Sequence, residues 1–471
     1  MLAIFAMSVR ISMDTDSWWH LRAGQWILEN HAIPQVDVFS YTRNGQAWQY
    51  PGWLVEVPMY LIYQWLGPGG LNLWTAALVT LSFFFIWQAS SGDYFLRSFV
   101  LILAATASGV YWSARPHLVT LLCSAIYLYV LEQFRWKKPE ADSKSLIWLP
   151  VLMLIWANSH GGFIVGFLIW GVYMLDGMVR WRKAELAARS LMTLLFIGVV
   201  MVMAVCLNPA GPSMLAYPFK TAQIGALQNY IQEWQPPDFT TLSVQPFAWL
   251  MLLAFGAVGC SGMRLALTDF LLVAGFGYLG LTAGRNIALF ALVAPLLITR
   301  HTQALLSQHL KRFDDNLQPG ERHYYLKTAV NWAILCLLCL ATILKAASVF
   351  PAAVNQAAFE KFLPVKAVAV VRLQQPPKTL FNSYNWGGYL LFNLPDYAVF
   401  VDGRTDLYDD QIIDQWVKVV QAKPGWQAIL EQWQVHTILL EPHWPVSSLL
   451  AGEGWRLDYQ DEIAMVFTRP K

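Results

Sequence analysis

Long apolar runs separated by short polar connections make up most of the chain. Runs with almost no charge occur at 71–89, 98–112, 117–134, 145–157, 162–179, 190–207, 246–263, 266–282, 286–299 and 328–346. Several fall short of the about 20 residues that a membrane-spanning helix needs, so their boundaries are soft. Residues 1–13 are also apolar apart from Arg10, and we count them as a shortened first helix. The pattern predicts a polytopic α-helical membrane protein of about eleven spans.

One further apolar segment, residues 53–66, is short and contains Glu56 and Pro58. We interpret it as an interfacial or re-entrant helix within a long first loop, residues 13–70, rather than as a span. If it crossed the membrane, the order of all later connections would be inverted.

Lys and Arg gather in three connections, at residues 135–144, 180–189 and 300–327. Because basic residues mark cytoplasmic loops, these should face the cytoplasm. The remaining connections then face outward, at residues 14–70, 113–116, 158–161, 208–245 and 284–286. The sequence therefore predicts a multi-pass protein of the bacterial cytoplasmic (inner) membrane whose distinctive polar residues share the outer face.

Composition supports this class and excludes others. Charged residues make up 13% of the 471 positions, against about 25% in an ordinary soluble domain. The net charge of +2 says nothing about partners, but the lack of a basic stripe argues against nucleic acid. The five cysteines fall in apolar stretches without metal-ligand spacing, which predicts buried hydrophobic residues rather than disulfides.

Residues 347–471 change in composition and predict a small extracytoplasmic α/β domain after a membrane domain of residues 1–346. Strand patterns occur at 379–382, 398–402, 436–441 and 464–468, and helical patterns at 386–393 and 411–421.

Two carboxylates open the first outer loop, in Asp14 and Asp16, with His20 and Arg22 close behind. Side chains two residues apart share one face of an extended chain. Paired carboxylates can act as a general base, and they leave open a divalent metal, Mg²⁺ or Mn²⁺, which the chemistry does not require. The alternative is that one of them caps the following helix, residues 18–30.

Polar turns on the same face supply further candidates. Arg115 precedes a proline that can start a helix, so it could bind a phosphate there, although snorkelling to lipid head groups explains it equally well. Arg285 would be a second cation, and two arginines suit the phosphodiester or pyrophosphate of a polyprenyl-linked donor. His160 is either catalytic or structural. Glu233 and Trp234 could bind a sugar or form a surface turn.

The other candidate substrate-binding residues are Trp18, Trp19, Glu56, His117, Asn158 and Asn286, together with Asp402 and Arg404 of a C-terminal Asp-Gly-Arg-Thr-Asp motif. For the aromatic residues the alternative is interfacial anchoring. For Glu56 it is a helix cap, and for Asp402 and Arg404 it is a tight turn held by an ion pair.

The chain resembles the type C glycosyltransferase (GT-C) superfamily, whose members carry an acidic motif in the first outer loop and often a soluble C-terminal domain. It is more specifically similar to a group of bacterial membrane proteins that share an Asp-x-x-Trp-Trp-His-Leu-Arg motif. The motifs that carry this likeness cover nearly the whole chain, at residues 16–22, 115–116, 156–161, 208–209, 233–239, 285–286 and 402–406.

The resemblance implies an enzyme that moves a sugar from a polyprenyl-phosphate donor to an outer-face acceptor (a glycan, lipid or protein), with inversion at the anomeric carbon. In that mechanism Asp16, aided by Asp14, acts as general base, and Arg115 and Arg285 stabilise the leaving phosphate. His160 orients the donor. The alternatives are a ligase that moves a whole glycan, or a non-enzymatic transporter, flippase or scaffold in envelope glycan assembly. Clean spans with polar ends favour an enzyme over a transporter.

Overall fold

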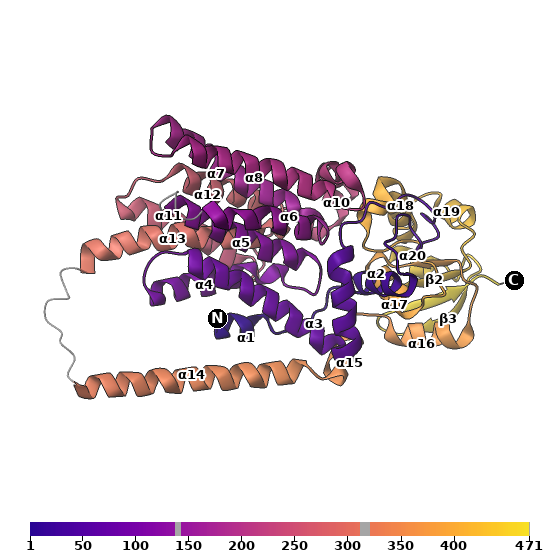
Figure 1. Ribbon diagram of the computed structural model, residues 1–471. Helices are drawn as coiled ribbons and strands as arrows, with labels where there is room; N and C mark the ends of the chain where they lie inside the picture. Colours follow the sequence, from indigo (N-terminus) through magenta and orange to yellow (C-terminus); the bar gives the residue numbers. More distant parts are fainter. Residues whose placement is uncertain (137–142, 311–320, 471) are drawn as a thin grey trace.

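The computed structural model describes residues 1–136, 143–310 and 321–470, which form a helical bundle with a mixed α/β domain at one end (Figure 1). The predicted fold class is confirmed. The bundle helices are α1 (Leu2–Ser8), α3 (Trp53–Ala89), α4 (Tyr94–Ser108), α5 (His117–Trp136), α6 (Trp148–Ala157), α7 (Ile164–Arg182), α8 (Ala188–Cys206), α11 (Gln245–Ser261), α12 (Leu267–Thr282), α13 (Ile287–Leu310) and α14 (Glu321–Val349).

Every predicted apolar run falls on one of these helices. Within the described residues, seven helices are long and apolar enough to cross a membrane, and three shorter apolar helices accompany them. The total of eleven spans therefore stays a prediction. Part of the third basic connection, residues 311–320, and residues 137–142 lie outside the described residues.

Helix α3 consists of two helices that meet at a kink. Gly67 has φ 64° and ψ −162°, a left-handed conformation that glycine adopts readily, and Pro68 follows it. The part before the kink, residues 53–66, runs across the ends of the long helices in Figure 1. This geometry agrees with an interfacial helix that precedes the first long span after the loop.

The C-terminal domain contains a four-stranded sheet of order β1-β2-β4-β3, in which β1 is parallel to β2 and the other pairs are antiparallel. Its strands and helices are α15 (Ala352–Phe359), α16 (Val365–Gln374), β1 (Leu380–Asn382), α17 (Gly387–Asn393), α18 (Thr405–Val420), α19 (Trp426–Gln432), β2 (Thr437–Leu440), α20 (Pro445–Leu449), β3 (Arg456–Gln460) and β4 (Met465–Thr468). The predicted strand 398–402 is wrong, because there only Val399 forms isolated bridges, to Ser40 and Leu380. Strand β3 was not predicted, since its polar, largely exposed side chains lack an apolar face.

Two separate hydrophobic cores divide the molecule. One lies within the helical bundle. The second joins the first loop to the C-terminal domain, and includes Trp18 and Phe39 from the loop with Phe400 and Tyr408 from the domain. Helix α2 (Ser17–Asn30) packs against α17 in this second core. The first loop therefore fastens the C-terminal domain to one end of the bundle.

Candidate active site

A cavity of about 870 Å³ lies between one end of the helical bundle and the C-terminal domain. Its walls come from the first loop, the turns before α5 and α7, the connection between α8 and α11, and α18. Of the residues predicted from sequence, those that line it are Asp14, Asp16, Trp19, His20, Arg115, His117, His160, Glu233, Trp234, Arg285 and Asn286. Segments far apart in sequence thus meet in one opening, while the roles of these residues stay predictions.

The two carboxylates of the first loop have different surroundings. Asp14 Oδ1 accepts the backbone N–H of Asp16 at 3.0 Å, and its Oδ2 accepts the hydroxyl of Ser113 at 2.7 Å. Asp16 occupies the N-cap position of α2, yet its side chain makes no capping bond and instead lies 3.1 Å from Nη2 of Arg115. Asp14 therefore stabilises the turn through both of its oxygens, whereas the Asp16 carboxylate can take part in a reaction.

Arg115 and Arg285 are bridged by one carboxylate. Arg115 Nη1 lies 3.3 Å from Oε2 of Glu233, and Arg285 Nη1 lies 3.5 Å from Oε1 of the same residue. Arg115 also contacts Asp14 at 3.3 Å, so its guanidinium faces three acids. The Arg285 guanidinium stacks 4.3 Å from the ring of Trp234. Both predicted phosphate-binding cations are present in the cavity, and both are already paired with acids.

Asp16 and Glu233, two of the three acids that face Arg115, differ in the direction of their pKa shifts. Burial raises the pKa of Asp16 to about 7, against the opposing effect of the Arg115 guanidinium. The two arginines overcome burial at Glu233 and lower its pKa to about 2. Near neutral pH, Glu233 is therefore a fixed anion, while Asp16 can gain or lose a proton, as a general base must.

The hydrogen bonds of His160 define its tautomer. Its Nδ1 accepts the backbone N–H of Gly162 at 3.1 Å. Because this backbone N–H makes Nδ1 an acceptor, the Thr120 hydroxyl, whose Oγ1 lies 2.7 Å from Nδ1, donates its proton to it. Thr120 Oγ1 in turn accepts the indole N–H of Trp156 at 2.8 Å. Burial also lowers the pKa of His160 well below its usual range. His160 is therefore neutral, with Nε2–H free to donate into the cavity.

Two neighbours, Glu56 and Trp19, fix the position of the His20 ring. Its Nδ1 contacts Oε1 of the fully buried Glu56, and its ring stacks on Trp19 with centroids 3.5 Å apart. Glu56 therefore does not line the cavity, contrary to its prediction as a substrate-binding residue. Instead it fixes the orientation of His20, which does line the cavity.

Three other predicted substrate-binding residues also lie outside the cavity lining. Trp18 packs edge-on against Phe359 and Tyr389 in the second core, because it points about 100° around the helix from Trp19. Arg22 pairs with Glu29 on the surface. Asn158 hydrogen-bonds to Trp53 and Asn208 and so ties three turns together.

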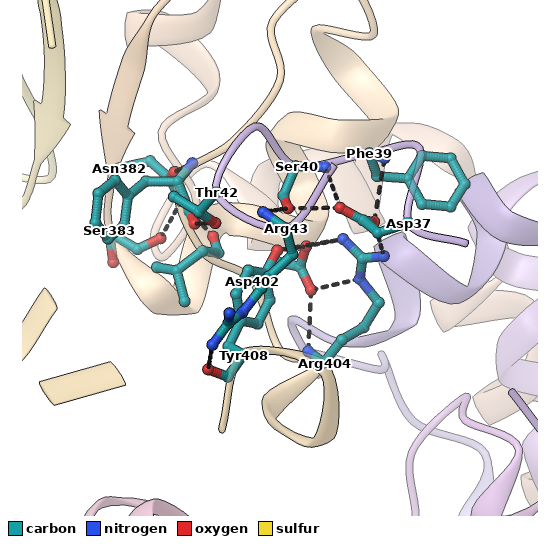
Figure 2. Close-up of polar contacts among 12 residues, drawn as sticks. Asp37, Phe39, Ser40, Thr42, Arg43, Asn382, Ser383, Asp402, Arg404 and Tyr408 are labelled. Carbon is teal, nitrogen blue, oxygen red and sulfur yellow. Dashed lines mark hydrogen bonds and ion pairs between the residues drawn. The ribbon is translucent and has the colours of Figure 1, made fainter. Parts of the chain in front are cut away.

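Asp402 and Arg404 form a buried network instead of a binding surface, which corrects their predicted role (Figure 2). Arg404 donates to Asp402 at 2.8 and 2.6 Å and to Asp37 at 2.6 Å. Tyr408 donates to Asp402 at 2.7 Å. Asp37 also accepts the hydroxyl of Ser40, at 2.6 Å. The motif is thus an ion pair that links the C-terminal domain to the first loop, as in the alternative reading from sequence.

The turn made by this network brings its glycine against the first loop. A Cβ built on Gly403 would lie 1.8 Å from Oδ1 of Asp16, and one on Gly388 would lie 3.0 Å from the carbonyl oxygen of Thr15. Any side chain at position 403 would displace the Asp16 carboxylate from this position. The C-terminal domain therefore forms part of the wall around Asp16.

Several cavity residues were not singled out from sequence. Asp406 accepts a hydrogen bond from Tyr217 at 2.9 Å, and Tyr384 hydrogen-bonds to Thr405 at 2.6 Å. Trp416 lines the same side of the cavity. Asp406 ends the Asp-Gly-Arg-Thr-Asp motif at residues 402–406, but nothing in the pattern distinguishes Tyr217 or Trp416 from other aromatic residues.

The surroundings of Asp14 and Asp16 do not suit a metal ion between the two carboxylates. The Arg115 guanidinium contacts both carboxylates. Across the part of the chain that the structure describes, no group of three or more His, Cys, Asp or Glu side chains is arranged to hold an ion. A cation between these two acids would have to displace Arg115.

Comparison with known proteins gives a structural likeness. No family model matches the chain, and no curated protein matches it in sequence. The crystal structure of an oligosaccharyltransferase from Archaeoglobus fulgidus, tethered to an acceptor peptide containing the NVT sequon, aligns with 100% of this chain and 73% of its own length, at 12% identity and a TM-score of 0.55.

This alignment decides the fold. The chain has the GT-C fold. Two further structures align with 100% of the chain at TM-scores below 0.5. They are ArnT from Cupriavidus metallidurans bound to undecaprenyl phosphate (15% identity, 98% of its length, TM-score 0.49) and the arabinofuranosyltransferase AftD from mycobacteria (13%, 39%, 0.45). Within the GT-C fold of this chain, the candidate site lies where the helical bundle meets the C-terminal domain.

Proposed function

We propose that the protein is a glycosyltransferase that moves a sugar from a polyprenyl-phosphate donor to a hydroxyl-bearing acceptor on the outer face of the cytoplasmic membrane. The observation that carries this proposal is the convergence of Asp16, Arg115 and Arg285 on one cavity at the end of an apolar bundle. The resemblance of the fold to an oligosaccharyltransferase supports glycan transfer as the class of reaction.

In the proposed reaction Asp16 accepts the proton of the acceptor hydroxyl. The acceptor oxygen forms a bond to the anomeric carbon as the bond from that carbon to the phosphate oxygen breaks, and the leaving group is the lipid phosphate. Arg115 and Arg285 stabilise the charge that builds on this phosphate, and the Nε2–H of His160 adds a neutral donor. Trp19 and Trp234 provide aromatic faces for sugar stacking.

The proposed orientation follows from the two ends of the bundle. Arg135 and Arg180 lie in the last turns of α5 and α7, whereas the first residues of these helices line the cavity. Arg300 pairs with the same Asp269 as Arg135, so it lies near the same end of the bundle, remote from the cavity. Basic residues at that end favour a cytoplasmic location for it. The cavity and residues 347–471 would then lie on the extracytoplasmic side, where a flipped lipid-linked sugar is accessible.

The test is transfer by the purified protein. Detergent-solubilised wild-type protein is incubated with a panel of polyprenyl-linked sugars and candidate acceptors, and the products are identified by mass spectrometry. Asp16→Asn should lower the rate by about 10²- to 10⁴-fold, because the base is lost. The matched control is Asp396→Asn, which removes a carboxylate from the exposed surface of the C-terminal domain. Full transfer by Asp16→Asn would refute the assignment of the base, and transfer of an intact oligosaccharide would identify a ligase.

A further inference from the structure

The wall that the C-terminal domain contributes to the cavity carries little charge. Its described lining residues include no lysine or arginine, and Asp406 is the one acidic side chain among them. The neighbouring wall, from the connection between α8 and α11, also lacks lysine and arginine among its described lining residues. Arg115 and Arg285 come from other turns of the bundle. The space between these two walls therefore suits a neutral ligand better than an anionic one.

Three aromatic side chains of the C-terminal domain, Tyr384, Trp416 and Trp444, form a continuous aromatic wall of the cavity. The ring centroids lie 5.9 Å apart for the first pair and 5.5 Å apart for the second. The indole N–H of Trp416 donates to the carbonyl oxygen of Asn382 at 2.9 Å. That of Trp444 donates to Oε2 of Glu441 at 2.8 Å. Both indoles are thus held in place by the protein, and they offer the cavity apolar ring surface rather than donors.

Side chains that can hydrogen-bond to a ligand accompany the aromatic wall. Asn385, Asp406 and Gln421 of the same domain line the cavity. The Tyr217 hydroxyl donates to Oδ2 of Asp406 at 2.9 Å and so links this domain to the connection between α8 and α11. A sugar has apolar ring faces and hydroxyl groups around its edge. Aromatic rings next to amide and carboxylate groups complement both of these features.

The aromatic wall lies close to the proposed base. Gly403 of the same domain is in direct contact with Asp16. Burial, and after it the charge of the Asp16 carboxylate, raises the pKa of Tyr384, so this ring lies within electrostatic reach of Asp16. A sugar that rests on the aromatic wall can therefore present one of its hydroxyl groups to Asp16.

A peptide is less well matched to this part of the cavity. An extended peptide is commonly bound by pairing with the edge of a sheet, because its backbone groups then find partners. Of the strands that the structure describes, none lines the cavity. The recognition groups of this domain are side chains with aromatic faces, which favours a saccharide.

We propose that the acceptor is a neutral saccharide whose ring rests on the aromatic wall while one of its hydroxyl groups reaches Asp16. This inference rests on the proposed function and specifies the acceptor, which that function leaves as any molecule with a hydroxyl. The reacting hydroxyl gives its proton to Asp16 and bonds to the anomeric carbon as the lipid phosphate leaves. Asn385, Asp406 and Gln421 bind hydroxyl groups that do not react.

The test measures acceptor binding in the absence of donor. Purified full-length protein, in a detergent without a sugar head group, is titrated with maltohexaose, cellohexaose and chitohexaose, with hexagalacturonate as the acidic counterpart, and with a serine- and threonine-containing hexapeptide. Dissociation constants come from microscale thermophoresis. At least one neutral hexasaccharide should bind about tenfold more tightly than hexagalacturonate and the peptide. Its affinity should change little between about 0.05 and about 0.5 M NaCl, because no ion pair forms.

Trp444→Ala should weaken binding of that hexasaccharide by at least about tenfold, whereas Trp444→Phe, which keeps an aromatic face, should lose at most about threefold. The matched control is Trp433→Ala. Trp433 is another partly exposed tryptophan of the C-terminal domain, and its indole N–H likewise bonds to a side chain, that of Gln415, but it does not line the cavity. This variant should bind like wild type.

The inference is overturned if wild-type protein prefers hexagalacturonate or the peptide, or binds none of these probes, results that need no variant. It is also overturned if a folded Trp444→Ala protein keeps the wild-type affinity, or if sugar transfer occurs only to a peptide or a lipid. The proposed function survives each of these results. Conversely, binding of a neutral saccharide that depends on Trp444, without transfer from any polyprenyl-linked sugar, would refute the proposed function and leave the saccharide site.

Discussion

Gly403 of the C-terminal domain lies directly against Asp16 of the first loop. A Cβ at position 403 would lie 1.8 Å from Oδ1 of Asp16 and 3.2 Å from the indole nitrogen of Trp19. The residues on either side of Gly403, Asp402 and Arg404, are fully buried and bonded to each other. The domain that follows the membrane segment therefore helps to shape the surroundings of the proposed base.

Gly403→Ala should abolish most of the activity while the protein still folds. The added methyl group cannot occupy the position of the Asp16 carboxylate, so that carboxylate must move, and displacement by about 1 Å can cost about 10²-fold in rate. The measurement is kcat for sugar transfer. Gly452→Ala is the matched control, because its Cβ would meet its nearest neighbour at an ordinary 3.4 Å. Equal rates for the two variants would show that the contact with Gly403 does not matter.

The pH dependence of transfer should follow Asp16. Its pKa is raised to about 7, and a base must be unprotonated, so kcat/KM should rise with pH and reach half of its maximum near pH 7. Glu233 cannot produce this rise, because its pKa is lowered to about 2 and it stays ionised throughout. The measurement is kcat/KM between pH 5 and 9, with donor binding followed separately. A rate that is flat or falls across this range would contradict the assignment of Asp16 as base.

The hydroxyl of Thr120 should control which nitrogen of His160 carries the proton. Thr120→Val removes the bond to Nδ1, whereas Thr120→Ser keeps it. We expect Thr120→Val to weaken binding of undecaprenyl phosphate by about tenfold and Thr120→Ser to bind like wild type. ¹⁵N NMR of histidine-labelled protein, with His160 assigned through His160→Gln, reports the tautomer directly.

The control for this pair is Thr106→Val, because Thr106 is an exposed residue of α4 that hydrogen-bonds only within its own helix. A wild-type spectrum with the proton on Nδ1 of His160 would contradict the relay from Trp156 through Thr120. Unchanged binding in Thr120→Val would show that the tautomer has no effect on the ligand.

The convergence of Asp16, Arg115, His160 and Arg285 could be predicted from sequence because it depends on the order of the spans. Once the apolar runs and the basic connections are known, alternate connections must face the same side, and these four residues lie on that side. Exact span ends are not needed for this inference. The kink in α3 falls between the predicted segments 53–66 and 71–89, where Gly67 leaves the helical conformation and Pro68 follows it.

The role of Arg404 could not be predicted in the same way. An Asp-Gly-Arg sequence has the same local pattern whether its arginine faces a ligand or a buried carboxylate. What decides between them is the partner Asp37, which is 367 positions away and reaches Arg404 only because the first loop packs on the C-terminal domain. Likewise, the sequence does not distinguish Trp18 from Trp19. The position of α2 places Trp18 in the second core and Trp19 in the lining of the cavity.

Removal of Asp37 from its buried pair with Arg404 should destabilise the protein strongly. Both side chains are 0% exposed and lie 2.6 Å apart, and Figure 2 shows Asp37 reaching Arg404 from the first loop. Asp37→Ala would leave part of a buried guanidinium unpaired, which typically costs about 3–5 kcal/mol. Glu29→Ala breaks the surface pair with Arg22, whose glutamate is 51% exposed, and should cost at most about 1 kcal/mol. The measurement is the thermal unfolding midpoint in detergent, together with protease sensitivity of the connection between the bundle and the C-terminal domain. If Asp37→Ala unfolds at the same temperature as Glu29→Ala, the network does not fasten the domain to the loop, and the position of Gly403 against Asp16 must be maintained by the apolar contacts of the second core alone.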